Sequence, residues 1–213
     1  MHPAIAIDGP AASGKSTVAK LIAERLGYTF INTGAMYRAV TWYMLEQGID
    51  PKDTAAVVAA LPAAPLAFGK EGSQSVVLCS GSPLKNELTR QEVNGHVSTI
   101  AAIPEVRTLL VDKQRAYNRE EPVVMEGRDI GTVVFPNTPF KYFVTASEEV
   151  RAARRAAEGL TDSITERDRK DASRAVAPLA QAKDALLVDT SDMTIEQVVS
   201  FITDNIQHKI AAR

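Results

Sequence analysis

The chain has 213 residues, of which 45% are hydrophobic, and its formal net charge is -2. That length and apolar content suffice for one domain with a full core, and the near-neutral charge argues against a general nucleic-acid or membrane surface. The single cysteine excludes an intramolecular disulfide and a cysteine-based metal cluster. The three histidines do not have the spacing of metal ligands.

The apolar segments are short. No stretch of the sequence reaches the length of a membrane span, and the first strand candidate begins at Ala4, so no signal peptide is expected before it. We therefore expect a cytoplasmic protein with no nucleic-acid or membrane partner. Because no extended apolar helix face is left over, we also expect a monomer.

The first predicted elements are a strand, a glycine-rich loop and a helix. Residues 4–7 read Ala-Ile-Ala-Ile, an apolar run typical of a buried parallel strand. Residues 9–16 read Gly-Pro-Ala-Ala-Ser-Gly-Lys-Ser and match the phosphate-binding pattern G-x-x-x-x-G-K-[ST]. Apolar residues then recur at helical spacing up to Gly27, a typical C-cap. A chance match in a tight turn is the alternative, but this order of strand, loop and helix favours a nucleoside triphosphate site.

Each part of the loop has a chemical task. The glycines let backbone N–H groups close around phosphate oxygens, and the helix N-terminus adds the positive end of its dipole. Lys15 has the length to reach the terminal phosphates, and the hydroxyl of Ser16 is suited to ligate Mg2+. The predicted ATP-binding residues of the loop are Gly9, Pro10, Ala11, Ala12, Ser13, Gly14, Lys15, Ser16 and Thr17.

Further strands and helices alternate along the chain. Strand candidates are residues 28–32, 122–126, 140–145 and 186–189. Helices are predicted over 36–47, from 89, over 104–117, over 147–158 and from 194, with capping boxes at Thr89 to Glu92 and Thr194 to Gln197. This alternation predicts an α/β protein with a five-stranded parallel sheet flanked by helices.

Two segments interrupt the alternation. Within residues 62–87, apolar runs at 66–68 and 75–79 flank a turn at 69–72, which predicts a small antiparallel hairpin. Residues 157–173 are polar, charged and weakly periodic, which predicts a mobile cover over the site.

Arginines follow several of the predicted strands. Arg38 comes after the second strand and Arg128 after the third, at the carboxyl ends where ligands of α/β sheets bind. Bringing two phosphorylated nucleotides together concentrates negative charge, and arginines from several elements would neutralise it. An ordinary surface or ion-paired arginine is the alternative for each, and the strand-end positions favour a functional role for these two.

At these motifs the chain resembles the bacterial cytidylate kinases, which belong to the nucleoside monophosphate kinases. The segments that carry the resemblance are Ile7 to Pro10 leading into the phosphate loop, Thr33 to Arg38, Arg90 to Val93, Glu126 to Pro136 and Arg174 to Leu179. The resemblance implies the P-loop kinase fold as a single domain over 1–213. It also implies a monophosphate-binding region at about 33–107, with an antiparallel insert at about 62–87, and a lid at about 155–173 that is shorter than the family usually has.

The resemblance further implies transfer of the γ-phosphoryl group of ATP to CMP or dCMP in pyrimidine nucleotide metabolism, with Mg2+ required. Residues matching the family's acceptor-phosphate site are Thr33, Arg38, Arg128 and Arg174. Residues matching its cytosine site are Ser98, Arg107 and Asp129. The match to Asp171 lies by the ribose, near Arg167, and those to Arg151 and Arg154 lie on the ATP side and the lid.

Asp129 and Asp171 each have both a functional and a structural interpretation. The carboxylate of Asp129 would accept from the exocyclic amino group of cytosine and repel the carbonyl of uracil, a discrimination of roughly 1–3 kcal/mol. It could instead be a salt-bridge partner that fixes Arg128. Asp171 could accept from a ribose hydroxyl or be a solvated lid charge.

Phosphoryl transfer through a loose transition state needs positioning and charge neutralisation, so no general base is nominated. Lys15, Arg128 and Arg174 are the expected catalytic residues. Ser16 is the expected direct Mg2+ ligand, and Glu126 would act through water. The guanidinium of Arg151 or Arg154 could stack on adenine. The alternatives are a kinase of another small acceptor such as UMP, and a GTP-dependent switch, for which the chain lacks the Asn-Lys-x-Asp signature.

Overall fold

The computed structural model describes residues 2–157 and 164–212, built around one sheet with strand order β3-β4-β2-β6-β1-β7-β8 and β5 paired to β4. The parallel strands are β1 (Ala4–Asp8), β2 (Thr29–Asn32), β6 (Val123–Gly127), β7 (Phe140–Thr145) and β8 (Leu186–Asp189). They confirm the predicted five-stranded parallel core and the α/β class, to within a residue at each end.

Helices follow the strands on both faces of the sheet. The α-helices are α1 (Lys15–Leu26), α2 (Thr33–Glu46), α3 (Thr54–Ala60), α4 (Gln91–Ile100), α5 (Pro104–Glu120), α6 (Glu148–Ala157), α7 (Ile164–Ala172) and α8 (Ile195–Ala211). Short helical turns are η1 (Leu61–Ala63) and η2 (Asn86–Thr89), both 3-10, and the π-helix η3 (Ile130–Val134). None of the helices in the described ranges is long and apolar enough to cross a membrane.

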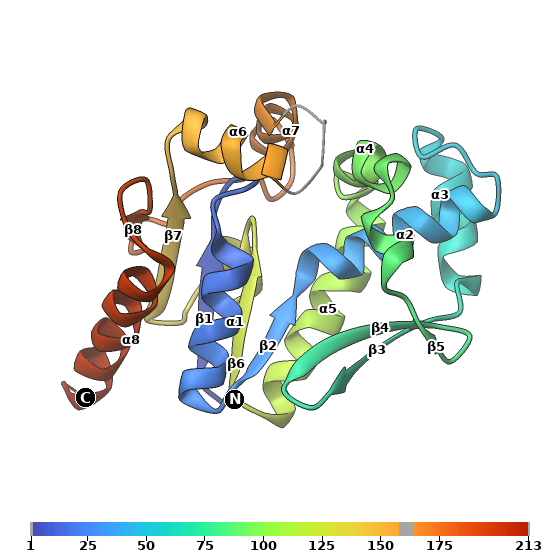
Figure 1. Ribbon diagram of the computed structural model, residues 1–213. Coiled ribbons are helices and arrows are strands. Elements are labelled where there is room, and N and C mark those ends of the chain that lie inside the picture. The colour runs from blue at the N-terminus through green and yellow to red at the C-terminus, as the bar shows by residue number, and fades with distance from the viewer. Residues whose placement is uncertain (1, 158–163, 213) are drawn as a thin grey trace.

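Side chains of β1 alternate between the two faces, as a strand requires. Ile5 and Ile7 pack with α1 and α8, whereas Ala4 and Ala6 pack with α5 and η3. Figure 1 shows α1 and α8 in front of the sheet and α5 behind it. Burying both faces explains why the first strand is apolar throughout.

The insert extends the main sheet. Its hairpin consists of β3 (Leu66–Glu71) and β4 (Gln74–Cys79), with the short β5 (Ser82–Pro83) paired to β4. The predicted turn at 69–72 is wrong, because residues 69–71 pair in the strand and the chain reverses at Gly72 and Ser73, where Gly72 has a φ of +60°. Pairing of Phe30 with Gln74 joins the hairpin to β2, so the five parallel strands become part of an eight-stranded sheet.

Helix starts agree with the sequence in part. The capping box at Thr194 is confirmed, with Gln197 N donating to Thr194 Oγ1 over 3.2 Å. The one at Thr89 is wrong: the Thr89 hydroxyl donates to the carbonyl of Asn86 inside η2, and α4 begins after Arg90 without a side-chain cap. Helix α2 begins at Thr33, three residues before the prediction.

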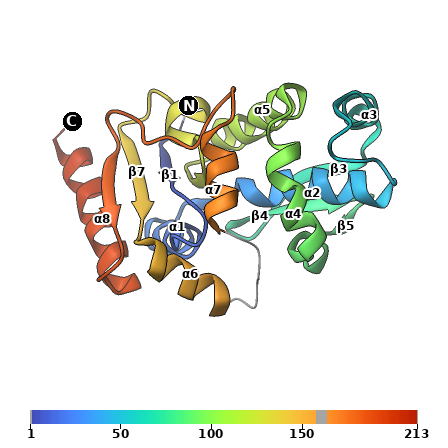
Figure 2. The same cartoon turned by 90° about the horizontal axis from the view of Figure 1, so that it is seen from above.

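The charged segment after α6 is helical where the structure describes it. Residues 158–163 of the predicted cover lie outside the described residues. Residues 164–172 form the helix α7, which the weak periodicity of this segment does not predict, and the mobility of the cover stays a prediction. In the view from above (Figure 2), α7 lies between α6 and α4, which it contacts. Asp171 at its end is only 2% exposed. The high charge of this segment predicted that its side chains are exposed. Asp171 is buried instead, because its partners Arg128 and Ser98 come from distant parts of the chain.

Candidate active site

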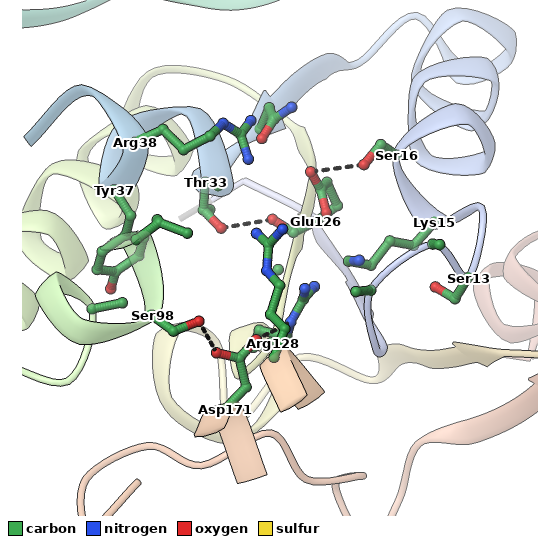
Figure 3. A pocket seen from close by; sticks show the side chains of 18 of the residues that line it. Ser13, Lys15, Ser16, Thr33, Tyr37, Arg38, Ser98, Glu126, Arg128 and Asp171 are labelled. Carbon is green, nitrogen blue, oxygen red and sulfur yellow. Dashed lines mark hydrogen bonds and ion pairs between the residues drawn. The ribbon is translucent and has the colours of Figure 1, made fainter. Parts of the chain in front are cut away.

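A cavity of about 220 Å³ lies at the carboxyl ends of β1, β2 and β6. Figure 3 shows Lys15 and Ser16 on one side, Arg38 and Tyr37 on the other, and Arg128 and Asp171 between them. The predicted site residues that line it are Ala11, Ala12, Ser13, Gly14, Lys15, Ser16, Thr17, Thr33, Arg38, Ser98, Arg107, Glu126, Arg128, Asp129, Arg167, Asp171 and Arg174. The fold thus brings most of the predicted phosphate loop and all of the predicted acceptor residues to one cavity.

The phosphate loop spans the turn from β1 to α1. Gly14 has a φ of +83°, and a Cβ at Gly9 would lie 2.0 Å from the carbonyl oxygen of Val144, so both positions favour glycine. Lys15 is 6% exposed, and its Nζ donates to the Pro10 carbonyl over 2.9 Å. Burial, aided by the charge of Arg128, lowers the pKa of Lys15 to about 7. A bound anion would restore that charge, as expected of a phosphate-binding lysine.

Ser16 and Glu126 lie together at the junction of α1 and β6. The Ser16 hydroxyl donates to Glu126 Oε1 over 3.0 Å, and Glu126 is 4% exposed. Thr33 Oγ1 donates to the Glu126 carbonyl over 2.8 Å, which ties α2 to the same strand end. A hydroxyl and a carboxylate are oxygen ligands of the kind Mg2+ prefers, with phosphates and waters completing the shell. In the described ranges no cluster of three or more His, Cys, Asp or Glu suits a metal.

Positive charge dominates the cavity. Its lining has seven cationic side chains, Lys15, Arg38, Arg107, Arg128, Arg155, Arg167 and Arg174, against the three carboxylates Glu126, Asp129 and Asp171. Burial lowers the pKa of Arg38 and Arg174 and brings that of Arg167 to about 10, with repulsion from Arg128 contributing in each case. The buried Ser13 Oγ and Arg174 Nε have no hydrogen-bond partner among the described residues. Such a site favours a ligand with several negative charges.

Asp171 connects α7 to two other parts of the site. It accepts from Arg128 Nε over 2.9 Å and from Ser98 Oγ over 2.8 Å, and it pairs with Arg174. Burial acts to raise the pKa of Asp171, but Arg128 and Arg174 outweigh it and hold that pKa below its ordinary value. The alternative of a solvated lid charge is therefore wrong.

Asp129 forms a buried ion pair with Arg107 of α5, with side chains 7% and 4% exposed. The alternative partner, Arg128, instead binds Asp171. Burial raises the pKa of Asp129 despite the nearby Arg107, Arg174 and Arg128. The Arg107 guanidinium also lies 5.6 Å from the centre of the Tyr37 ring. Sequence reasoning missed Tyr37 as a lining residue, although it stands within the segment Thr33 to Arg38.

Arg151 and Arg154 do not line the cavity, and neither do Gly9 and Pro10. Arg151 Nη1 donates to the Ala11 carbonyl over 3.1 Å, and Arg154 Nη1 donates to the Ser13 carbonyl over 3.3 Å. Both guanidinium groups thus support the phosphate loop from its outer side.

Asp168 of α7 also contacts the phosphate loop. Its Oδ1 accepts from the Ala11 amide over 2.8 Å, and its Oδ2 pairs with Arg151. Sequence reasoning missed Asp168, because nothing in a charged helix indicates which carboxylate points inward.

Known proteins resemble this chain in sequence and in fold. The family model described as cytidylate kinase matches residues 5–208. A cytidylate kinase of Lactiplantibacillus plantarum is 44% identical over 96% of this chain and 95% of its own length. One of Corynebacterium efficiens is 46% identical over 93% of this chain and 91% of its own. An unliganded sugar kinase from Janibacter sp. HTCC2649 shares the fold alone, with a TM-score of 0.50 and 16% identity over 97% of this chain and 95% of that one. The chain belongs to the cytidylate kinase family.

Proposed function

We propose that this kinase transfers the γ-phosphoryl group of ATP to CMP or dCMP, giving ADP and CDP or dCDP. The observation that carries the proposal is the meeting, in one cavity, of a phosphate loop and a second set of cationic groups around a buried acid–arginine pair. The family membership supports the same activity.

The phosphate loop would hold ATP, with Lys15 on its terminal phosphates. Arg38, Arg128 and Arg174, with Thr33, would hold the acceptor phosphate. A loose transition state spreads charge over the transferred group, so positioned cations suffice and no base is needed. Arg128 suits a bridging role, because its Nη1 already donates to the Gly9 carbonyl over 3.0 Å, at the start of the loop.

Mg2+ would be held by Ser16 directly and by Glu126 through water. It supplies charge neutralisation on the ATP phosphates when bound. The hydrogen bond between these two side chains holds them together for that role.

The base would be read by Ser98, Arg107 and Asp129. The buried Asp129 accepts from Arg107 and retains lone pairs for the amino group of cytosine, whereas the carbonyl of uracil would meet a negative charge. Asp171, beside Arg167, would face the ribose. Three donors already satisfy Asp171, so a missing 2′-hydroxyl would cost little and dCMP would be accepted.

We further propose one domain over 1–213 that acts as a cytoplasmic monomer, without nucleic-acid or membrane partners. Its monophosphate-binding region would be about 33–107, with the insert within it, and its lid about 155–173. Arg151 and Arg154 of the lid side would contribute to ATP binding through the loop they support. The monomer is tested by light scattering during size-exclusion chromatography.

The activity is tested by coupled ADP release with ATP, Mg2+ and one acceptor at a time: CMP, dCMP, UMP, AMP, GMP or shikimate. CMP and dCMP are expected to give the highest rates, with UMP slower. Rates with CMP and dCMP equal to the rate without acceptor would refute the assignment. A rate with UMP above that with CMP would support the alternative, a UMP kinase.

A further inference from the structure

We propose that Asp8 is a positioning residue that fixes the loop of Arg128 and Asp129 against the phosphate loop. The proposal rests on the proposed function, in which these two residues bind the acceptor nucleotide. Asp8 is the last residue of β1 and directly precedes Gly9, the first residue of the phosphate loop. The backbone of Asp8 therefore leads into the phosphate loop, whereas its side chain contacts the segment that follows Arg128 and Asp129.

The carboxylate of Asp8 holds two consecutive amides. Oδ1 accepts from Ile130 N and Oδ2 accepts from Gly131 N, each over 2.7 Å. Asp8 is 4% exposed, so bulk water is not available as a substitute partner. These amides open η3, and the first amides of any helix lack partners within it. Asp8 therefore supplies acceptors that the backbone of this segment cannot.

The far end of η3 is held by other side chains. Arg115 of α5 donates to the carbonyls of Val134 and Val133 over 3.1 and 2.9 Å. Lys141 of β7 donates to the Pro136 carbonyl over 2.6 Å. A π-helix is rare and is frequently found at functional sites, so side-chain hydrogen bonds at both ends of this segment indicate that its shape is required.

Arg128 and Asp129 lie between two fixed points. On one side, Gly127 ends β6 in register with Asp8. On the other side, the Asp8 carboxylate holds the amides that follow Asp129. The packing there is close: a Cβ at Gly131 would lie 3.3 Å from Asp8 Oδ2 and 3.2 Å from the Cδ atom of Lys141.

A displacement of Asp8 would therefore move the segment of Arg128 and Asp129 relative to the phosphate loop. In-line transfer is sensitive to such errors, since a misplacement of about 1 Å can reduce a rate about 100-fold. A purely structural role is the competing explanation, because any buried carboxylate with two amide partners stabilises a fold. The two explanations differ in what they predict for acceptor binding and base choice.

The test compares Asp8→Asn with Asn118→Leu. The asparagine at position 8 keeps the size of the side chain but offers one acceptor oxygen and turns an NH2 group toward an amide. Asn118 is 1% exposed and donates to the carbonyls of His2 and Pro3 at the opposite end of the first strand. The control thus removes two partly buried hydrogen bonds near the same strand, at the end opposite the cavity.

For Asp8→Asn we expect kcat/KM for CMP to fall about 10- to 100-fold and the preference for CMP over UMP to fall several-fold, with the Kd for ATP within about twofold of wild type. Asn118→Leu should lose stability while keeping the CMP/UMP ratio and KM. Equal loss of stability in both variants, with KM and the ratio unchanged in Asp8→Asn, would overturn the proposal.

A second variant and a second readout keep the test decisive. Gly131→Ala leaves the Asp8 carboxylate intact but crowds it. If Asp8→Asn does not fold, Gly131→Ala should still lower the ratio of CMP to UMP use.

If wild type does not phosphorylate CMP, the proposed function fails, and amide hydrogen exchange still decides the role of Asp8. If amide exchange in Asp8→Asn is faster than in wild type at residues 128–131 and unchanged at residues 15–17, the proposal is supported. If exchange at residues 128–131 is the same in both proteins, the proposal is contradicted.

Discussion

The two halves of the cavity are built in different ways. The phosphate loop and the start of α1 form one contiguous segment, residues 9–17, and residues 11–17 of it line the cavity. The acceptor half is assembled from distant segments: Ser98 and Asp171 are 73 positions apart, Arg128 and Asp171 are 43 apart, and Arg107 and Asp129 are 22 apart. A local motif thus determines the arrangement of the first half, whereas tertiary packing determines the arrangement of the second.

The largest effect is expected on the ATP side. Lys15→Met keeps the length of the side chain but removes its charge, and should lower kcat about 10²- to 10³-fold, as loss of one preorganised donor does elsewhere. The Kd for CMP, measured by calorimetry, should stay within about twofold of wild type.

Lys20→Met in α1 is the matched control, and should leave kcat unchanged. A large loss of CMP affinity in Lys15→Met would show that the two halves of the cavity are not separable in this way.

A smaller effect is expected on base choice in the acceptor half. Asp129→Asn replaces a carboxylate by an amide with a donor, and should lower the ratio of kcat/KM for CMP over UMP about tenfold. Asp168→Asn removes a carboxylate on the ATP side and should leave the ratio as in wild type. A ratio that Asp129→Asn does not change would remove Asp129 from base selection.

A still smaller effect is expected at Ser98. Ser98→Ala removes one hydrogen bond to Asp171, worth about 1 kcal/mol, and should raise KM for CMP about fivefold. The neighbouring Thr99→Ala is the control, with KM unchanged. If kcat falls while KM is constant, Ser98 acts in the transition state and not in acceptor binding.

The smallest effect is expected in the pH dependence of stability. Burial acts to raise the pKa of Asp171, whereas Arg128 and Arg174 act to lower it. The arginines outweigh burial, so the pKa of Asp171 lies below its ordinary value of 3.8. The folded state thus releases this proton more readily than the unfolded state does. The contribution of Asp171 to stability is present above pH 4 and is lost as the pH falls through its folded pKa.

Urea unfolding at several pH values tests this for wild type and Asp171→Asn. The difference in free energy of unfolding should be largest at neutral pH and should shrink below pH 4. A difference that grows on acidification would mean that burial, and not the arginines, dominates at Asp171.

The sequence predicts the local structure of the donor half, whereas for the acceptor half it predicts the lining residues but not their contacts. Periodicity and the phosphate-loop pattern place β1, α1 and Lys15, because the signal is local. The family resemblance brings Asp129 and Asp171 to the site but says nothing of their partners: Asp129 pairs with Arg107, and Asp171 is buried and not solvated. The turn of the hairpin was misplaced because Gly69 resembles a turn residue, whereas pairing with Val76 keeps it in the strand.

The outer side of the phosphate loop has a consequence for ATP binding. Arg151 and Arg154, which do not line the cavity, already donate to the carbonyls of Ala11 and Ser13. Folding has therefore already restricted the backbone freedom of the loop, and little entropy remains to be lost when a nucleotide arrives. ATP would meet a rigid receptor whose shape is maintained from behind, so exchange of nucleotides need not reshape the loop at each turnover.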